Sequence, residues 1–344
     1  MTMQCSLAAV RTFLHRKDIE FSVQRYGVDA LGSMALGLFA SLIIGLIFKT
    51  AGTKLGVGMF VEVGKLAMDM SGPCIGVAVA WGLKAPVLVL FASAVTGMAG
   101  YAAGGPAGAF AAAAVGAEGG KIIAGESGLD IIITPAATLL LGVGTGMAVG
   151  PGIAAFMTGL GRLIMTATEM QPIPMGIFVS VLMGITLTLP ISSAAIAIML
   201  NLGGIAAGAA TVGCCCHLVG FAIAGYRDNG PSGLISLGLG CSMLQVPNII
   251  KNPRIWIPPI LSSAILGPLV TTVFPMQNLP EGAGMGSSGL VGQISTFAAM
   301  GTGIEVWLLI LFFHFLLPGL LAWCIAAVLR RRGWIHDGDM RIPC

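Results

Sequence analysis

The chain has 344 residues, of which 56% are hydrophobic and only 9% are charged. A soluble domain carries about 25% charged residues because its surface must be hydrated, so this composition excludes a soluble globular protein and favours an exterior that faces lipid. The formal net charge of +3 is too small to suggest nucleic-acid binding.

A helix needs roughly 20 apolar residues to cross a bilayer, with a range of about 17–25. The stretches that qualify are 28–48, 86–103, 131–150, 173–189, 203–223, 257–274 and 306–329. Shorter apolar pieces lie between them, at 56–64, 73–83, 107–117, 191–202 and 233–243. We therefore predict an all-α polytopic membrane protein with about 10 membrane elements, some of them re-entrant or broken helices.

The sequence suggests a lead-in (1–27), a single transmembrane transport domain (28–329) and a tail (330–344). Lys and Arg accumulate on the cytoplasmic side of membrane proteins. Both flanks are basic, with Arg11, Arg16, Lys17 and Arg25 before the first span and Arg330, Arg331 and Arg332 after the last. Both termini are therefore expected in the cytoplasm. No polar run is long enough for an ATPase or enzyme domain, so coupling energy is expected from an ion gradient or another polypeptide.

Two clusters of charge interrupt the apolar sequence, where a charge costs about 2.5–3.5 kcal/mol at a helix centre and tends to be paired or functional. Glu62, Lys65 and Asp69 share one helix face, which favours an amphipathic helix over a binding site. The Ala-rich piece 107–117 ends in Glu118, two glycines and Lys121. Such a break suits a re-entrant tip in which Glu118 binds sugar hydroxyls or carries a proton; an aqueous loop is the alternative.

Hydroxyl side chains surround a predicted helix break at Pro190, because proline removes a backbone donor and disfavours helical geometry in the preceding residue. They are Thr186, Thr188, Ser192 and Ser193. Freed carbonyls and hydroxyls form a neutral polar pocket suited to a polyhydroxylated solute. A simple proline kink, satisfied by its own hydroxyls, is the alternative.

Further polar candidates follow in the second half of the chain. Gln245 and Asn248 flank Pro247 between apolar pieces, and Lys251 and Arg254 suggest a cytoplasmic loop after them. The run 282–289 is rich in glycine and precedes Gln293, which allows the backbone to approach a ligand. We expect Gln245, Asn248 and Gln293 to contribute to solute binding.

Several familiar motifs are absent or lack their context. The glycines at 284, 286 and 289 follow no predicted strand, and Gly120-Lys121 lacks the other residues of a phosphate-binding loop. Cys214, Cys215, Cys216 and His217 form an apolar thiol run with a polar end, for which helix packing is favoured over metal binding. No metal and no cofactor is therefore expected. His217 and His314 remain candidates for proton-linked groups.

Four strings carry a resemblance to a known family: GITLTLPISSAAIAIML, GAATVGCCCHLVGFA, SMLQVPNIIKNPRIWIPP and GAGMGSSGLVGQ. They resemble phosphotransferase-system enzyme IIC relatives of the perfringolysin-regulator type, over about residues 37–293. The resemblance implies a homodimer in a bacterial inner membrane, with an enzyme IIC-like helical fold that moves a sugar through a membrane cavity. It also implies separate IIA and IIB partners for phosphorylation, since this chain lacks that machinery.

One departure from that family bears on function. Sugar-specific relatives place a glutamate after Gly-Ile-Thr, whereas here Gly184-Ile-Thr is followed by Leu187. The leading hypothesis is a sugar or related small-solute transporter subunit. A membrane sensor that binds solute without transport is one alternative, since the relatives are named as regulators. An ion-coupled carrier for an anion or metal, using Glu118 or His217, is another.

Overall fold

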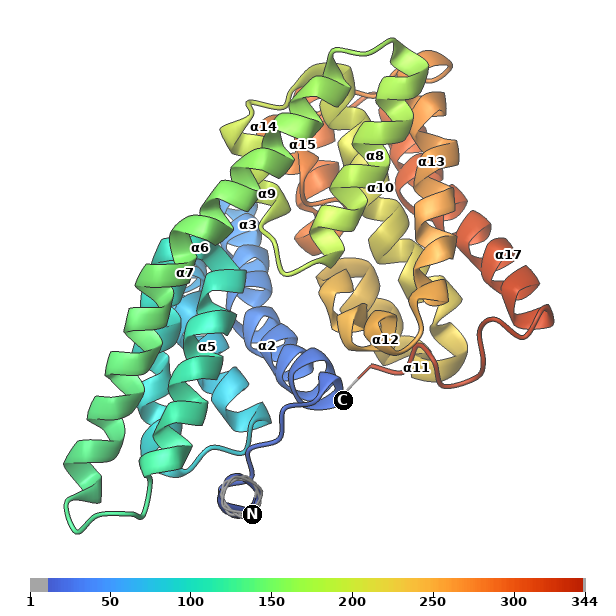
Figure 1. Ribbon diagram of the computed structural model, residues 1–344. Helices are drawn as coiled ribbons and strands as arrows, with labels where there is room; N and C mark the ends of the chain where they lie inside the picture. Colours follow the sequence, from blue (N-terminus) through green and yellow to red (C-terminus); the bar gives the residue numbers. More distant parts are fainter. Residues whose placement is uncertain (1–11, 343–344) are drawn as a thin grey trace. The chain divides into compact units, whose positions relative to one another are not determined.

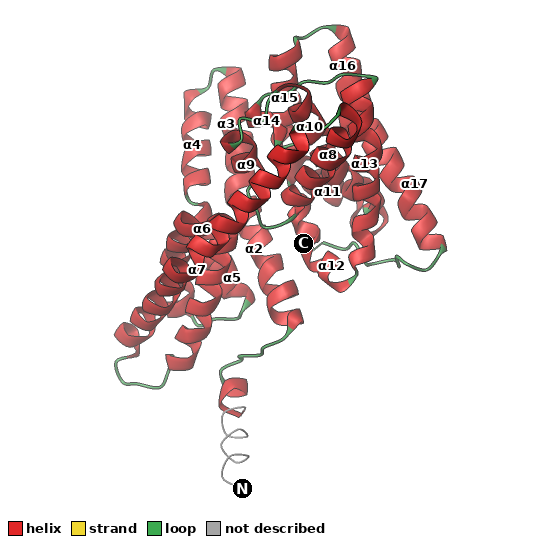
Figure 2. Ribbon diagram, turned by 45° about the horizontal axis from the view of Figure 1, so that its top comes forward, coloured by secondary structure: helices red, strands yellow, loops and turns green. Residues whose placement is uncertain are grey.

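The computed structural model describes residues 12–342, apart from the side chains of Thr50, Lys54, Ala195 and Met199. Across these residues the fold is all-helical, with 82% helix and no strand (Figure 2). Within the described residues, six helices are long and apolar enough to cross a membrane, or seven if the bent pair α4–α5 is one span. The predicted all-α membrane class is confirmed, while the predicted count of about 10 elements is not.

The bounds of the elements follow the chain. The α-helices are α2 (Leu31–Leu38), α3 (Ile44–Leu55), α4 (Gly58–Asp69), α5 (Ser71–Gly82), α6 (Val87–Ile123), α7 (Asp130–Thr168), α8 (Pro172–Thr188), α9 (Ser193–Met199), α10 (Gly204–Ala224), α11 (Tyr226–Ile235), α12 (Val246–Lys251), α13 (Ile257–Thr272), α14 (Pro280–Ala283), α15 (Val291–Met300), α16 (Ile304–Ile310) and α17 (Leu317–Arg331). The π-helical segments are η1 (Gln24–Ala30), η2 (Phe39–Ile43), η3 (Ser236–Gly240) and η7 (Leu311–Leu316), and the 3₁₀ segments are η4 (Ser242–Gln245), η5 (Pro253–Trp256) and η6 (Ser288–Leu290).

The chain divides into two compact units. Unit 1 comprises residues 1–42 and 67–154, and unit 2 comprises residues 43–66 and 155–344. Helices α4 and α7 each run across a boundary between the units.

In unit 1, helix α6 is a hairpin of two antiparallel legs. The backbone leaves helical geometry at Gly104 and Gly105, and Gly105 has φ +62° and ψ −152° before Pro106. Such a positive φ favours glycine because it has no Cβ. The chain then reverses: a Cβ on Gly100 would strike the carbonyl of Gly108, and one on Gly116 would lie 3.3 Å from Thr96. The absence of side chains at Gly100 and Gly108 lets the two legs meet.

Helix α7 packs its glycine face against this hairpin. A Cβ on Gly142 would strike Thr96, one on Gly146 would lie 3.2 Å from Gly100, and one on Gly150 would lie 2.5 Å from Ala103. The three glycines recur every four residues and so share one face of the helix. Small residues on one face allow two helix backbones to pack closely.

The expected break at Glu118–Lys121 is wrong. Helix α6 continues through Gly119 and Gly120 to Ile123, and the break lies at Gly104–Gly105 instead. A Cβ on Gly119 would strike Leu141, and one on Gly120 would strike Thr138. These two glycines therefore permit close packing within a continuous helix, whereas Pro106 removes a backbone donor where the chain turns.

Unit 2 is built around α10, most of whose residues are buried. Helix α8 packs antiparallel to α13, with Gly176 against Gly267 and the Ser180 hydroxyl donating to the Ser263 carbonyl at 2.8 Å. The same α8 face meets α10, where a Cβ on Gly213 would overlap the Ser180 backbone. Figure 1 shows α8, α10 and α13 side by side. Glycine at these crossings brings three backbones into contact.

Two segments of unit 2 start beside the Gly204 end of α10, run alongside this helix and return to the same end. Helix α8 begins beside the end of α13, where the Thr271 hydroxyl donates to the Pro172 carbonyl at 2.7 Å. The chain breaks after Thr188, and α9 leads back to Gly204, which pairs with Asn278. The second segment runs from Asn278 through α14 and η6, and α15 leads back to Met300, whose sulfur lies 3.2 Å from the Gln277 nitrogen. The break predicted around Pro190 is thereby confirmed.

A third segment enters unit 2 from the opposite end of α10. It starts in α11, just after α10 ends at Ala224, and continues through η3 to Gly240. The backbone becomes extended at Cys241, and η4 and α12 follow. In a membrane protein, non-helical backbone is tolerated at depth only where it is buried in protein or lines a cavity. The non-helical turns of these three segments are therefore candidate places for a functional site, and they lie beside the middle of α10.

Candidate functional site

The three turns of unit 2 converge on residues 214–217 of α10, and we call this place the junction. The Ser193 hydroxyl donates to the Gly284 carbonyl at 2.6 Å, which joins the first turn to the second. The Ser287 hydroxyl donates to the Gly238 carbonyl at 2.5 Å, which joins the second to the third. Side-chain hydroxyls thus satisfy carbonyls that the broken helices leave free.

His217 lies where the first and third turns approach α10. Its Nδ1 is 2.8 Å from the Thr188 hydroxyl and 3.3 Å from the Trp256 indole nitrogen, and the Thr188 hydroxyl is 3.1 Å from that of Ser242. An indole N–H can only donate, so Nδ1 accepts and the neutral ring carries its proton on Nε2. His217, Thr188 and Ser242 are fully buried.

The other nitrogen of His217 has no partner among the described residues. Nε2 is buried, and a Cβ on Gly184 would lie 2.8 Å from it. Glycine at position 184 therefore leaves the room that the imidazole occupies. A buried N–H without a partner costs about 1–3 kcal/mol, and such a group calls for an explanation in terms of strain, chemistry or a bound molecule.

A second polar cluster lies on another side of α10, at Cys215, two residues before His217. The Gln293 amide nitrogen is 3.0 Å from His314 Nδ1 and 3.6 Å from the Cys215 sulfur. The amide nitrogen donates, so the proton of the neutral His314 ring is again on Nε2. That nitrogen and Gln293 Oε1 are buried without partners among the described residues. His314 belongs to π-helical η7, a geometry frequent at functional sites.

The remaining hydroxyl candidates at the α8 break have different surroundings. Thr186 is buried and its hydroxyl donates to the Leu182 carbonyl of its own helix at 2.7 Å. Ser193 joins the first turn to the second, as described above, and Ser192 lies beside it in the turn. Of the predicted residues, the structure therefore brings Thr188 and His217 into direct contact. Gln293 lies in the neighbouring cluster.

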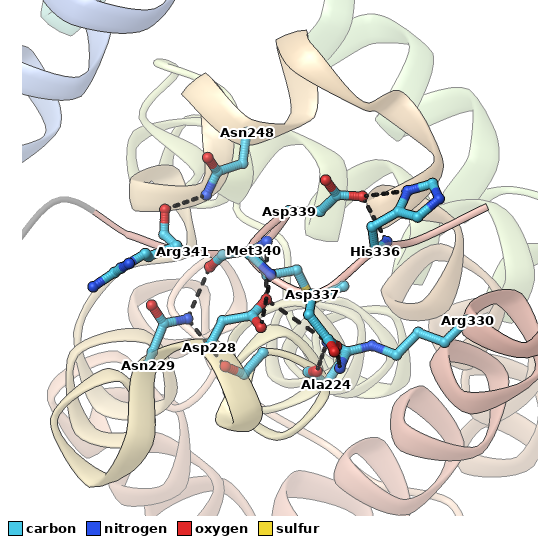
Figure 3. A network of polar contacts seen from close by, with 12 residues as sticks. Ala224, Asp228, Asn229, Asn248, Arg330, His336, Asp337, Asp339, Met340 and Arg341 are labelled. Atoms are coloured by element: carbon cyan, nitrogen blue, oxygen red, sulfur yellow. Dashed lines mark hydrogen bonds and ion pairs between the residues drawn. The ribbon is translucent and has the colours of Figure 1, made fainter. Parts of the chain in front are cut away.

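Gln245 and Asn248 contact the chain's own C-terminal end rather than the junction. The Gln245 amide donates to the Met340 carbonyl at 2.8 Å, and the Asn248 amide donates to Gln245 Oε1 and to the Arg341 carbonyl. Residues 333–342, which we call the strap, are also held by Asp228, whose carboxylate accepts from the Gly338 and Met340 nitrogens, and by Asn229 (Figure 3). Gln245 is nevertheless the last residue of the 3₁₀ segment η4, of which Ser242 is the first.

Glu118 lies in unit 1, within a cluster of paired charges. Its Oε1 accepts from the Tyr26 hydroxyl at 3.1 Å, and its Oε2 is 3.0 Å from Lys121 Nζ. Lys121, only 2% exposed at its side chain, also donates to the Leu83 carbonyl at 2.9 Å. Arg25 binds the same carbonyl and pairs with Asp18 at 2.7 Å. This cluster ties the lead-in to the ends of α5 and α6.

Sequence reasoning missed three parts of the junction. Ser242 and Trp256 were not singled out, although both belong to a string that carries the family resemblance. The sequence marks Gly184 only as the start of the Gly-Ile-Thr string before Leu187, and gives no sign that it lies against His217. A polar residue within an apolar run was the available signal for Ser242. For Trp256 and Gly184 no sequence signal existed, since their roles depend on contact with His217.

No group of three or more His, Cys, Asp or Glu side chains with metal-binding geometry occurs among the described residues. Cys214, Cys215 and Cys216 are fully buried. The Cys214 thiol is instead directed at backbone, 3.6 Å from the Met183 carbonyl. The run packs α10 against its neighbours.

Comparison with known proteins agrees with this helical membrane architecture. The model of the family described as "Phosphotransferase system, EIIC" matches residues 28–342. Neither the curated proteins nor the solved structures gave a match. The match covers most of the chain and includes every residue of the junction. The chain therefore belongs to the phosphotransferase-system EIIC family and is a multi-pass membrane subunit of a solute transporter.

Proposed function

We propose that the junction binds a neutral, polyhydroxylated solute, of which a sugar is the leading example, and that the protein moves this solute across the membrane. The observation that carries the proposal is the buried Nε2–H of His217, which has no partner within residues 12–342 and lies at the break between α8 and α9. A hydroxyl of a solute would accept from this donor without introducing charge into the junction.

The other unpartnered atoms of the region fit the same ligand chemistry. They are His314 Nε2, Gln293 Oε1, and the hydroxyls of Ser288 and Ser295. Together they supply donors and acceptors, as a hydroxyl-rich solute requires, and they include no fixed positive or negative charge. Sites that hydrogen-bond a substrate hydroxyl reject analogues lacking it, because their own buried groups are then unpaired. This chemistry favours a sugar over an anion or a metal ion.

The three turns of unit 2 suggest how a solute would move through the junction. They reach the junction from both ends of α10, which is the arrangement of transporters with broken helices at the bilayer midplane. Separation of the turns on one side or the other would open the junction to that side. The hydrogen bonds from Ser193 to Gly284 and from Ser287 to Gly238 would break and re-form in such a cycle. The solute cavity that we propose is thus formed by elements of unit 2 and does not include Glu118.

The distribution of charge within unit 2 supports a cytoplasmic C-terminus. The end of α10 beside the strap carries Arg227, Lys251, Arg254, Arg330, Arg331, Arg332 and Arg341, and we call it the basic end. At the other end lie Glu169, Glu281 and Glu305. Basic flanks favour the cytoplasm. We propose a bacterial inner-membrane location with both termini cytoplasmic, a homodimer, and separate IIA and IIB partners.

Two substitutions of His217 test the solute site. Asn places an amide atom near the position of Nδ1 and removes the Nε2 donor, whereas Gln places its amide near Nε2. We expect a sugar to raise the melting temperature of the detergent-purified protein by mass action. His217→Asn should abolish this rise and His217→Gln should retain part of it. Ser262→Ala, which removes a buried hydroxyl that binds only its own helix, is the matched control.

The melting-temperature responses distinguish a sugar transporter from an ion-coupled carrier and from a sensor. Equal sugar responses in wild type and His217→Asn would refute a site at Nε2. A response to divalent metals or anions alone, lost in the same variant, would favour an ion-coupled carrier instead. Uptake into proteoliposomes then distinguishes transport from binding, since a sensor would bind sugar without accumulating it.

One contact favours a sensor of the perfringolysin-regulator type as the second candidate. Ser242, which contacts Thr188, and Gln245, which holds the strap, are the two ends of η4. A solute that displaces Ser242 would alter the support of the strap through one 3₁₀ turn. Hydrogen exchange of residues 333–342 tests this: a change on sugar binding supports signalling through the C-terminus, and no change opposes it.

A further inference from the structure

A surface pocket at the basic end of unit 2 is separate from the junction. It has a volume of about 890 Å³ and lies between the end of α10, helix α11, helix α17 and the strap. Pockets of about 300–1,000 Å³ are typical of small-molecule sites. Its walls fall into two parts, one charged and one apolar. The charged wall comprises Arg227, Arg330, Arg331, His336 and Asp337, and the apolar wall includes Ile223, Leu234, Trp323, Ala326 and Ala327.

The three arginines of the pocket differ in their pairing. Arg330 is held in place: its guanidinium lies 3.2 Å from the Asp337 carboxylate and 3.7 Å from that of Asp228, and it donates to the Ala224 carbonyl at 3.1 Å (Figure 3). Arg227 and Arg331 are exposed and form no ion pair or hydrogen bond with any described residue. The pocket lining therefore includes two guanidiniums without an ion pair among the described residues, besides the fixed one of Arg330, and guanidiniums are well suited to binding a phosphate group.

The position of the pocket along the membrane-spanning helices indicates the source of that phosphate. Two candidate spans end there, Gly204–Ala224 and Ile304–Arg331. Tyr226 and Trp323 line the pocket and are 47% and 51% exposed. Amphipathic aromatic rings of this kind concentrate at the depth of lipid headgroups. Both features are those expected of a pocket at the depth of bilayer phosphates.

The apolar wall continues along a surface that acyl chains can cover. On α17, Leu320, Trp323 and Val328 are exposed, at 55%, 51% and 49%. In a spanning helix such side chains face lipid. A free phosphate compound would gain nothing from this surface, whereas a phospholipid would contact it with its tails and the arginines with its headgroup.

We propose that this pocket binds an anionic phospholipid, with the headgroup phosphate between Arg227, Arg330 and Arg331 and an acyl chain along α17. Basic pockets beside transmembrane helices on the cytoplasmic side are known to take acidic headgroups. The strap supplies one wall through Ile335, His336 and Asp337. Occupation of the pocket therefore stabilises the docked strap.

Phosphatidylglycerol is the probe that tests this site, and phosphatidylcholine is its zwitterionic counterpart. Native mass spectrometry of the full-length protein in detergent measures the apparent Kd of each lipid. We expect tighter binding of phosphatidylglycerol, weakened about fivefold by Arg227→Gln and by Arg331→Gln, since each Lys or Arg near an anionic surface contributes about that factor. Arg332→Gln is the matched control, because it removes the same charge from the next residue, which does not line the pocket.

Three results would overturn the proposal. Equal weakening by Arg331→Gln and Arg332→Gln would show only diffuse attraction to the basic end. Inorganic phosphate or glycerol phosphate binding as tightly as phosphatidylglycerol would identify a soluble phosphate compound as the ligand. No preference for phosphatidylglycerol over phosphatidylcholine would exclude an anionic headgroup. Arg330 is left unchanged in these variants because its ion pairs hold the strap.

Discussion

Units 1 and 2 each bury a polar cluster, and the two clusters are composed differently. In unit 1 the cluster is charged: Glu118, Lys121 and Arg25 are 9%, 2% and 6% exposed, and each lies in an ion pair. In unit 2 the junction and the neighbouring cluster of Gln293 and His314 are neutral and consist of imidazoles, hydroxyls and amides. Each imidazole leaves its Nε2 without a partner in the part of the chain that the structure describes.

The difference follows from the free energy of desolvation. An unpaired ion in an apolar interior costs far more than an unpaired neutral N–H, so charges within a membrane protein are found paired. Neutral groups can remain unpaired at about 1–3 kcal/mol each, which a solute can recover when it binds. The charged cluster is therefore suited to holding the lead-in against its unit, and the neutral junction is suited to exchanging a ligand.

The largest effect is expected where a buried ion pair of unit 1 is broken. Lys121→Met leaves Glu118 without its cation in a buried place, and removing one partner of a buried pair costs about 3–5 kcal/mol. Thermal unfolding in detergent should show this loss. The double variant Glu118→Leu/Lys121→Met should recover most of it, and Lys84→Met, whose side chain is 70% exposed, should have little effect. A small loss in Lys121→Met would mean that the cluster is open to water.

A smaller effect is expected at the strap, where one carboxylate supports two backbone donors. Asp228→Ala removes the acceptor of the Gly338 and Met340 nitrogens, and hydrogen bonds to a charged group contribute about 1.5–3 kcal/mol. Hydrogen exchange in residues 333–342 should accelerate. Asn252→Ala, which removes one hydrogen bond to Asp339 and one to Trp334, should act less. Unchanged exchange in Asp228→Ala would show that Gln245, Asn229 and apolar burial suffice.

The neutral junction should tolerate the loss of a hydroxyl better than unit 1 tolerates the loss of a charge. Thr188→Val keeps the shape of the side chain and removes its bonds to His217 and Ser242. A neutral hydrogen bond contributes about 0.5–1.5 kcal/mol net. The melting temperature should therefore fall slightly, while the sugar response is reduced. A loss of stability as large as that of Lys121→Met would contradict the contrast between the two clusters.

The smallest effect concerns the exposed rim of the unit 1 cluster. Hydrogen bonding to Lys17, with the charges of Lys17 and Arg16, lowers the pKa of Glu126. A lowered folded-state pKa contributes stability that is present above the unfolded value of about 4.3 and is lost as pH falls through the folded value. Proteolysis near Arg16 should therefore increase only under acid conditions. Glu126→Gln should remove this pH dependence while leaving Arg25 and Asp18 paired.

Much of the helical pattern could be predicted from the sequence, because apolar runs of sufficient length have few other stable forms. The break at Pro190 was likewise predictable, since proline acts locally. The position of the break in α6 was predicted wrongly. Gly119-Gly120 and Gly104-Gly105 are similar as sequence, and only the second pair precedes a proline. Which pair turns and which one packs depends on neighbours such as Leu141 and Thr138.

The candidate site was predicted in part, for a related reason. Polarity within apolar runs identified Thr188, His217 and Gln293, since such residues must find partners somewhere. It could not distinguish a residue facing the junction from one facing the strap. Gln245 lies three residues after Ser242, yet one binds the Met340 carbonyl and the other contacts Thr188. Side chains at i and i+3 of a 3₁₀ turn point in similar directions, so the division depends on which neighbours reach each residue. The end of α8 reaches Ser242, and residues almost a hundred positions later reach Gln245.

From the amino-acid sequence one can predict that this chain lies in lipid, that it is helical, that α8 ends near Pro190, and which family it belongs to. These properties depend on composition, on local backbone chemistry and on long specific strings. Only contacts in the folded chain show that Glu118 joins a paired cluster, that three turns meet around residues 214–217 of α10, and that the C-terminal strap occupies Gln245 and Asn248. Those outcomes depend on contacts between residues far apart in the chain, and the free energy of a polar group in an apolar interior is set by its partners rather than by its position in the sequence.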